Sequence, residues 1–163
     1  MSLLPAGPAA SRAALLLALA VPAALLGGAY IGQYVFGLWP CEMCWWQRYA
    51  HFAALACAVP ALIRPPAAML VRLAATAILI GGLIGAYHAG VEYGWWKGFT
   101  ACTSEVAFSG DPLKDILNAP MVRCDQVQWE LFGISLAGYN FLISVPAALL
   151  VFMLQGRSKR GAA

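Results

Sequence analysis

The chain has 163 residues, of which 62% are hydrophobic and only 10% are charged, with a mean hydropathy of +0.74 and a net charge of +3. Soluble domains carry about 25% charged residues, so this composition excludes a water-soluble protein and predicts one built for a bilayer. No basic surface with interleaved aromatic residues is evident, which argues against nucleic acid as a partner.

Four apolar stretches are long enough to cross a bilayer as helices, which takes about 20 predominantly apolar residues. They are residues 13–34, 44–63, 66–87 and 134–154. The first stretch could instead be the apolar part of a secretory signal, because Arg12 precedes it. Its polar and aromatic end at Gln33 and Tyr34 is more typical of a retained span than of a cleavage site. We therefore predict an all-α integral membrane protein in which one domain, residues 1–163, forms a four-transmembrane-helix bundle.

The charges outside these stretches predict how the bundle is oriented. All seven Asp and Glu residues lie in or beside two of the loops. The other loop and the two ends carry basic residues without an acid, namely Arg12, Arg64, Arg72, Arg157, Lys159 and Arg160. Lys and Arg concentrate on the cytoplasmic side of membranes. Both termini are therefore predicted to be cytoplasmic, with a short outer loop at residues 35–43 and a long outer loop at 88–133.

A Cys-x-x-Cys motif, Cys41 and Cys44, stands at the outer start of the second span and follows Pro40. Proline fixes a backbone angle suited to a helix start. Both cysteines are therefore predicted to lie in the first helical turn, where free N–H groups and the helix dipole favour thiolate. At 100° per residue the two cysteines share a helix face with Arg48, which lies about 6 Å deeper than Cys44.

Arg48 lies inside the predicted membrane face, where an arginine costs about 2.5 to 3.5 kcal/mol near the bilayer centre and less near the rim. It could lower the pKa of Cys44 and stabilise negative charge that develops on a bound acceptor. It could also be an interfacial arginine that reaches toward water. The face that it shares with the cysteines favours the first interpretation.

Two more cysteines, Cys102 and Cys124, lie in the long outer loop. They could form a structural disulfide worth about 3 kcal/mol in the chain-entropy model, or a redox couple that exchanges with the first pair. The residues alone do not distinguish a structural disulfide from a redox-active one. A fifth cysteine, Cys57, projects about 160° away from Cys41 on the helical wheel and about 20 Å below Cys44, so we predict a buried small side chain outside the site.

The chain has two histidines. His88 is predicted at the outer end of the third span, with Glu92 one turn further on. His51 lies about 10 Å deeper than Cys44, and we expect it to be hydrogen-bonded and packed. We expect Asn140, near the start of the fourth span, to cap or pack. In the long loop, the stretch 113–118 fits either a short surface helix or a flexible segment.

The order of these features resembles the DsbB family, quinone-linked membrane proteins that reoxidise the periplasmic thiol oxidant DsbA. The family's pattern is Pro-Cys-x-x-Cys followed by an arginine, a histidine near the outer end of the third span and a cysteine pair in the last outer loop. The matching residues are Cys41, Cys44, Arg48, His88, Cys102 and Cys124. The resemblance covers nearly the whole chain, from span order to loop order.

The resemblance implies a relay of disulfide exchange. The thiolate of a DsbA-like, thioredoxin-fold periplasmic partner attacks Cys102, and Cys124 is the leaving and resolving thiol. The released Cys124, or Cys102 after resolution, then reduces the Cys41–Cys44 disulfide through a transient bridge between Cys41 and one loop cysteine. Cys44 passes the electrons to a quinone, either ubiquinone or menaquinone, beside Arg48 and His88. The resemblance also implies a bacterial inner membrane protein with its redox cysteines on the periplasmic side and no metal.

Gln47 departs from the family pattern, because an acidic residue commonly precedes the arginine there. Without that acidic residue, Arg48 lacks a possible counter-charge. Two other functions use the same residues. A structural zinc site could be built from the four outer cysteines, but an oxidising location favours disulfides. An outward-directed reductant transporter would need a reactive cysteine reachable from the cytoplasm, and only Cys57 is a candidate.

Overall fold

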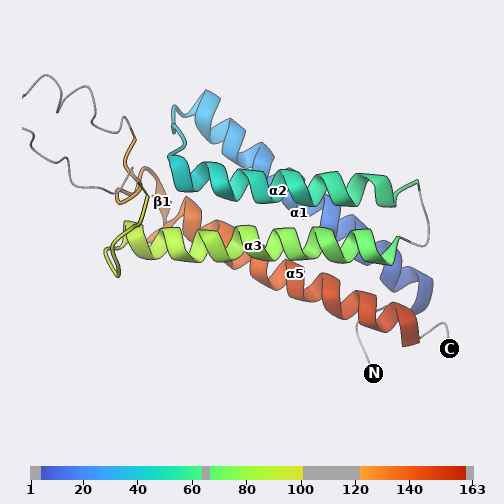
Figure 1. Ribbon diagram of the computed structural model, residues 1–163. Helices are drawn as coiled ribbons and strands as arrows, with labels where there is room; N and C mark the ends of the chain where they lie inside the picture. The colour runs from blue at the N-terminus through green and yellow to red at the C-terminus, as the bar shows by residue number, and fades with distance from the viewer. Residues whose placement is uncertain (1–4, 64–66, 101–121, 161–163) are drawn as a thin grey trace, which may run out of the picture.

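The computed structural model describes residues 5–63, 67–100 and 122–160, apart from the side chains of the last two. Within these residues the chain forms four long helices that run alternately up and down (Figure 1). They are α1 (Gly7–Val35), α2 (Glu42–Ala61), α3 (Ala68–Glu92) and α5 (Leu136–Arg160). Both termini lie at one end of the bundle, and the α1–α2 connection and the segment before α5 lie at the other (Figure 1). Cys102 and the possible surface helix at 113–118 fall outside the described residues.

Three helices, α1, α3 and α5, are long and apolar enough to cross a membrane. The second, α2, has 20 residues, but it is not among the described helices that meet this measure of apolarity. The charged or strongly polar side chains that lower its hydropathy are Glu42, Gln47, Arg48 and His51. A further difference from the sequence expectation is that α3 continues to Glu92, so His88 lies one turn inside the helix and not in the following loop.

At the end with the termini, the helices pack through small side chains. Ala10, Ala14 and Ala18 repeat every fourth residue of α1 and are fully buried. They belong to a core cluster that continues onto the other helices through Ala58, Ala61, Val71, Ala74, Ala75, Val151 and Leu154. Large apolar side chains face outward instead, including Leu16, Leu73, Ile80, Leu83, Leu142 and Leu149. Small residues at helix contacts are typical of membrane bundles, because lipid tails solvate leucine as well as a protein core does.

Toward the other end, glycines of α3 allow α5 to approach closely. A Cβ atom at Gly82 would lie 2.8 Å from the Cβ of Ser144. A Cβ at Gly85 would lie 2.8 Å from the carbonyl oxygen of Ala137 and 3.0 Å from Nδ2 of Asn140. These two contacts bring the polar side chains of α5 against α2 and α3.

A small β-hairpin that the sequence pattern did not predict precedes α5. Its strands, β1 (Glu130–Leu131) and β2 (Ile134–Ser135), are antiparallel. The two residues between them, Phe132 and Gly133, have φ angles of 53° and 74°, the left-handed pair that a tight two-residue hairpin needs. Tyr93, just after α3, donates its hydroxyl proton to Gly133 O at 3.1 Å. The hairpin is thereby fixed against the end of α3, next to the cysteines.

Candidate redox site

The Cys-x-x-Cys pair sits at the N-terminus of α2. The helix begins at Glu42, two residues later than Pro40 suggested, so Cys41 is the N-cap and Cys44 lies in the first turn. The backbone N–H of Cys44 donates to Cys41 Sγ at 3.4 Å. The two sulfur atoms are 3.1 Å apart, and both cysteines are free thiols. The pair is thus described in its reduced, dithiol form.

Cys41, which precedes the helix, carries the thiolate character. The pKa of its thiol is held well below the ordinary value, chiefly because the hydrogen bond that it shares with Cys44 stabilises its thiolate. Burial opposes this effect, and His88, with Nε2 3.5 Å from Cys41 Sγ, supports it. One proton is therefore shared across the pair, with the negative charge on the outer sulfur.

Arg48 does not reach toward water as an interfacial arginine would. Its side chain is only 6% exposed, and its guanidinium donates to Gln33 Oε1 at 2.6 Å and to Ala29 O at 3.2 Å. The rings of Tyr30 and Trp45 lie over it at 4.9 and 5.1 Å. We did not predict from the sequence that Gln33 would bind Arg48. The available signal was a glutamine in the last turn of an apolar stretch. Helix α1 therefore holds the charge of α2 in place.

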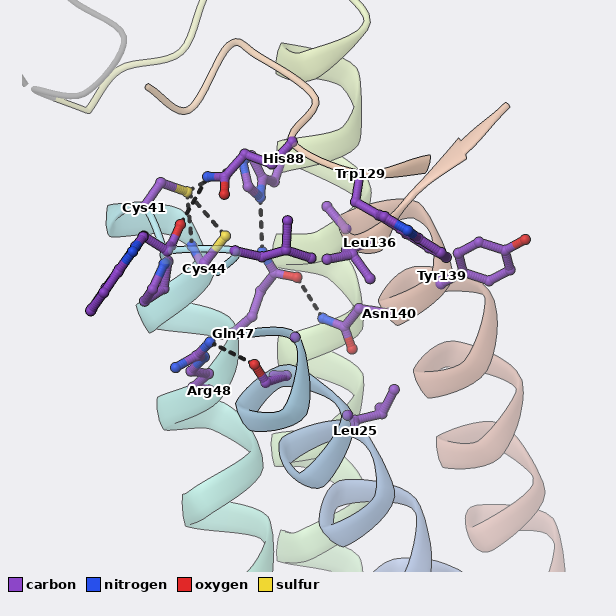
Figure 2. Close-up of a pocket in the computed structure, with 18 of the residues that line it drawn as sticks. Leu25, Cys41, Cys44, Gln47, Arg48, His88, Trp129, Leu136, Tyr139 and Asn140 are labelled. Atoms are coloured by element: carbon purple, nitrogen blue, oxygen red, sulfur yellow. Dashed lines mark hydrogen bonds between the residues drawn. The ribbon is translucent and has the colours of Figure 1, made fainter. Parts of the chain in front are cut away.

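Gln47 turns toward α3 and α5 and starts a buried network (Figure 2). Its Nε2 lies 3.0 Å from His88 Nδ1, and its Oε1 accepts from Asn140 Nδ2 at 2.7 Å. Asn140 Oδ1 in turn contacts His51 Nε2 at 2.9 Å and accepts from Ser144 Oγ at 2.8 Å. His51 is buried and hydrogen-bonded, as expected. Asn140 also donates to Gly81 O of α3 at 3.0 Å, so it does more than cap or pack and joins three helices.

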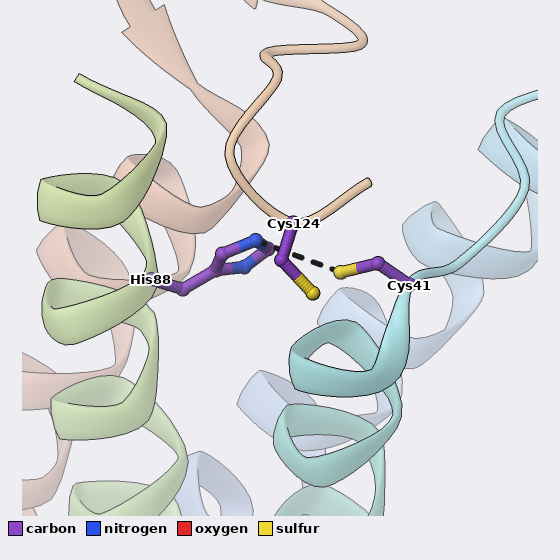
Figure 3. A group of neighbouring side chains, drawn as sticks. All are labelled: Cys41, His88 and Cys124. Atoms are coloured by element: carbon purple, nitrogen blue, oxygen red, sulfur yellow. Dashed lines mark hydrogen bonds between the residues drawn. The ribbon is translucent and has the colours of Figure 1, made fainter. Parts of the chain in front are cut away.

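The structure brings the distal loop onto the first cysteine pair. Sγ of Cys41, Sγ of Cys124 and a ring nitrogen of His88 all lie within 4.8 Å of one another (Figure 3). Cys124 is fully buried and disulfide-bonded. Its predicted partner, Cys102, is outside the described residues. Cys57 lies away from this group. It is partly buried against the core cluster that includes Ala10, Ala14 and Ala18, which we call the alanine cluster.

A cavity of about 210 Å³ opens beside these residues. Its walls come from all four helices and the segment before α5, and most of its lining is apolar, including Leu25, Gly28, Leu38, Trp129, Leu136 and Tyr139 (Figure 2). The polar lining includes Cys44, Arg48 and His88. Among the described residues, His51 Nδ1 and Glu92 Oε2 are buried without a hydrogen-bond partner, and both residues line this cavity. An apolar pocket with a few convergent polar groups suits a flat organic cofactor.

The group of Cys41, His88 and Cys124 also has the spacing of a metal site. A zinc ion binds thiolates, not disulfide sulfur. Because Cys124 is disulfide-bonded in this structure, the group would become a set of metal ligands only after reduction of that bond.

Comparison with known proteins gives one consistent result. The family model described as "Disulfide bond formation protein DsbB" matches residues 11–154. A disulfide bond formation protein B of Aromatoleum aromaticum is 32% identical over 93% of this chain and 96% of its own length. The proteins of that name from Verminephrobacter eiseniae and Chromohalobacter salexigens are 32% and 29% identical, over 93% and 85% of this chain and 89% and 90% of theirs. No solved structure matches the chain.

Proposed function

Since this chain belongs to the DsbB family of membrane disulfide bond formation proteins, we propose that it reoxidises a DsbA-like, thioredoxin-fold protein of the periplasm. The electrons pass through two cysteine pairs to a membrane quinone. The single observation that supports this best is the approach of Cys124 and Cys41, whose sulfur atoms lie within 4.8 Å of each other. Disulfide exchange requires direct attack of one sulfur on another, so a short path between the two pairs is the first requirement of a relay.

Four thiol–disulfide exchanges make up the proposed relay. A thiolate of the partner attacks Cys102 in the Cys102–Cys124 disulfide, a mixed disulfide forms, and Cys124 leaves as a thiolate. Cys124 attacks Cys41 in the Cys41–Cys44 disulfide, and Cys44 leaves. The partner's second thiolate then displaces Cys102, which releases the partner oxidised. Cys102 attacks the Cys41–Cys124 bridge, so its own disulfide returns and the first pair is left as a dithiol.

In the structure Cys41 and Cys44 are free thiols and Cys124 is disulfide-bonded. This redox state corresponds to the last of the exchange steps above. The attack by Cys102 ejects Cys41 as a leaving group, and a thiol with a low pKa leaves faster. The hydrogen bond from Cys44, which lowers the Cys41 pKa, therefore favours transfer of the electrons onto the first pair.

The cavity beside Cys44 fits a quinone ring by its size and its apolar walls. Cys44, Arg48 and His88 would hold the ring there. A bound quinone supplies a two-electron acceptor. The guanidinium of Arg48, kept inside the site by Gln33, supplies a fixed positive charge where negative charge develops, without reorganisation at the moment of reaction.

We further propose that α2 is a fourth membrane span, that the bundle lies in the bacterial inner membrane and that the cysteine end faces the periplasm. The distribution of basic residues supports this orientation. Arg12, Arg72 and Arg157 lie toward the end of the bundle that carries the termini, and Lys and Arg mark the cytoplasmic side.

The test uses the purified full chain in lipid, a reduced DsbA-like protein and a soluble ubiquinone or menaquinone analogue. Partner oxidation should follow quinone reduction one to one. Replacing Cys41, Cys44, Cys102 or Cys124 by alanine should abolish it, and Cys57→Ala is the matched control. Trapping of a Cys41–Cys124 bridge in a Cys44→Ala chain is expected. Quinone-independent oxidation, or full activity without Cys124, would refute the proposal.

A further inference from the structure

The buried network around Gln47 has a fixed direction, because two backbone carbonyls determine how its amides are oriented. Gln47 Nε2 donates to Met43 O at 3.2 Å, and Asn140 Nδ2 donates to Gly81 O at 3.0 Å. A carbonyl oxygen can only accept. Turning either amide over would place an oxygen against an oxygen in a buried site, which costs about 1 to 3 kcal/mol for each unsatisfied group.

The amide orientations in turn determine where the histidine protons lie. Gln47 Nε2 is a donor, so His88 Nδ1 must accept from it at 3.0 Å. Asn140 Oδ1 is an acceptor, so His51 Nε2 must donate to it at 2.9 Å. A neutral imidazole carries one proton. The proton of His88 is therefore on Nε2, the atom that lies 3.5 Å from Cys41 Sγ.

We propose that Gln47 and Asn140 are positioning residues that hold His88 as the neutral tautomer with its proton on Nε2. In this form His88 can donate a hydrogen bond to the Cys41 thiolate, but it cannot take a proton from the Cys41 thiol. The inference says which nitrogen of His88 donates toward Cys41. It rests on the proposed function only for the role of that hydrogen bond in turnover.

Protonation of His88 on both nitrogens would break the chain of donors. A proton on Nδ1 would face the Nε2 hydrogens of Gln47, whose own oxygen is held by Asn140 Nδ2 at 2.7 Å. Glu92, with Oε1 3.7 Å from His88 Nε2, is the acidic group nearest the ring among the described residues. Among the described residues, the Cys41 thiol is the other titratable group that faces the ring, because Cys124 is disulfide-bonded and does not titrate. Glu92 and Cys41 both lie on the Nε2 side, opposite Gln47.

An acidic residue at position 47 would reverse this arrangement. A carboxylate has no hydrogen to donate, and it accepts from Nδ1. His88 would then carry a proton on Nδ1, alone or with Nε2 protonated as well. The glutamine of this chain thus gives its histidine a different protonation state from the one that an acidic residue would give.

The test is nitrogen-15 NMR of the full chain, reduced, in lipid nanodiscs, with labelled histidine and a purification tag that contains none. The chain has two histidines, so His51→Gln assigns both. We expect wild-type His88 to show a protonated Nε2 and an unprotonated Nδ1. Gln47→Glu should protonate Nδ1. An Nδ1 proton in wild type, or identical spectra for the two chains, would overturn the proposal.

Gln155→Glu is the matched control, because Gln155 is also a buried glutamine, 2% exposed, but lies far along α5 from Asn140. It should leave both histidine spectra unchanged. If it changes the His88 spectrum as Gln47→Glu does, a buried carboxylate acts through the whole bundle and the positioning role is refuted.

A second readout is the pH profile of Cys41 alkylation, followed by peptide mass spectrometry. Gln47→Leu should move the midpoint up by about one pH unit, a tenfold loss of rate on the acidic side, because His88 is no longer held as a donor. In a His88→Leu chain the same substitution should have no further effect. Additive shifts would show that Gln47 does not act through His88. Neither readout requires quinone turnover, so loss of the proposed function would be seen separately.

Discussion

At the end of the bundle that carries the termini, the helices meet through alanine, and Ala14, Ala58 and Ala74 are fully buried there. At the cysteine end, the same helices bury Arg48, His88 and other polar side chains. A buried polar group costs free energy unless it is hydrogen-bonded, and in a bilayer water does not relieve the cost. The buried polar groups therefore gather at the end where we place the redox site. Gln155 is the exception at the alanine end among the described residues.

Cys44→Ala should have the largest effect, because it removes the disulfide of the first pair and the hydrogen bond that stabilises the Cys41 thiolate. We expect no turnover. In the fully reduced variant, in which Cys41 is not bridged to Cys124, the alkylation midpoint of Cys41 should rise toward the ordinary thiol pKa of about 8.5, so alkylation becomes slower at acidic and neutral pH. Peptide mass spectrometry across pH measures the shift. An unchanged midpoint would mean that Cys44 does not lower the Cys41 pKa.

Arg48→Ala should raise the KM for quinone and lower turnover by about 10²-fold, the usual scale for losing one preorganised charge or donor. Exchange of the partner with the distal disulfide should persist, and rapid mixing of chain and partner without quinone tests this. Arg48→Lys should fall between wild type and alanine, because lysine keeps the charge but not the forked contact with Gln33 and Ala29. Unchanged quinone kinetics would remove Arg48 from the site.

Gly85→Ala should test the close approach at the cysteine end. Its Cβ would lie 2.8 Å from Ala137 O and 3.2 Å from Gln47 Oε1, so we expect a loss of about 1 to 3 kcal/mol in stability. Thermal unfolding in detergent measures it. Gly156→Ala, at the alanine end, is the matched control, because nothing lies within 4 Å of its Cβ. It should be neutral or stabilising by up to about 1 kcal/mol. Equal losses at both ends would contradict the comparison.

Cys57→Ala should have the smallest effect. The side chain is partly buried against the alanine cluster, and alanine fits the same small space with a loss of about 1 kcal/mol or less. Turnover with partner and quinone should stay near the wild-type rate. An inactive variant would place a redox function at the end that we assign to packing alone.

The fold was predictable to the extent that it depends on single helices. Long apolar stretches predict helices without knowledge of their neighbours, and the helical wheel placed Cys44 and Arg48 on a face that now lines one cavity. The hairpin at 130–135 was missed because strands of two residues leave no periodicity to detect.

The cross-helix contacts of the site could not be predicted in the same way. The partners of Gln47 are on α3 and α5, 41 and 93 residues away in sequence. Which faces meet depends on how each helix is rotated against the others, and glycines such as Gly85 decide how close they come. A wheel drawn for one helix contains neither quantity. Gln33 and Asn140 therefore looked like ordinary polar residues in apolar stretches.

The helix on which we place the redox chemistry, α2, is the one long helix among those described that falls short of a membrane span by its own composition. Its guanidinium is hydrogen-bonded by α1 and its glutamine contacts α3 and α5. During biogenesis α1 emerges from the ribosome first, so a hydrogen-bonding surface for Arg48 already exists when α2 meets the translocon. On the proposed four-span topology, entry of α2 into the lipid is therefore coupled to assembly with its neighbours, and a chain that lacks α1 should leave α2 poorly inserted.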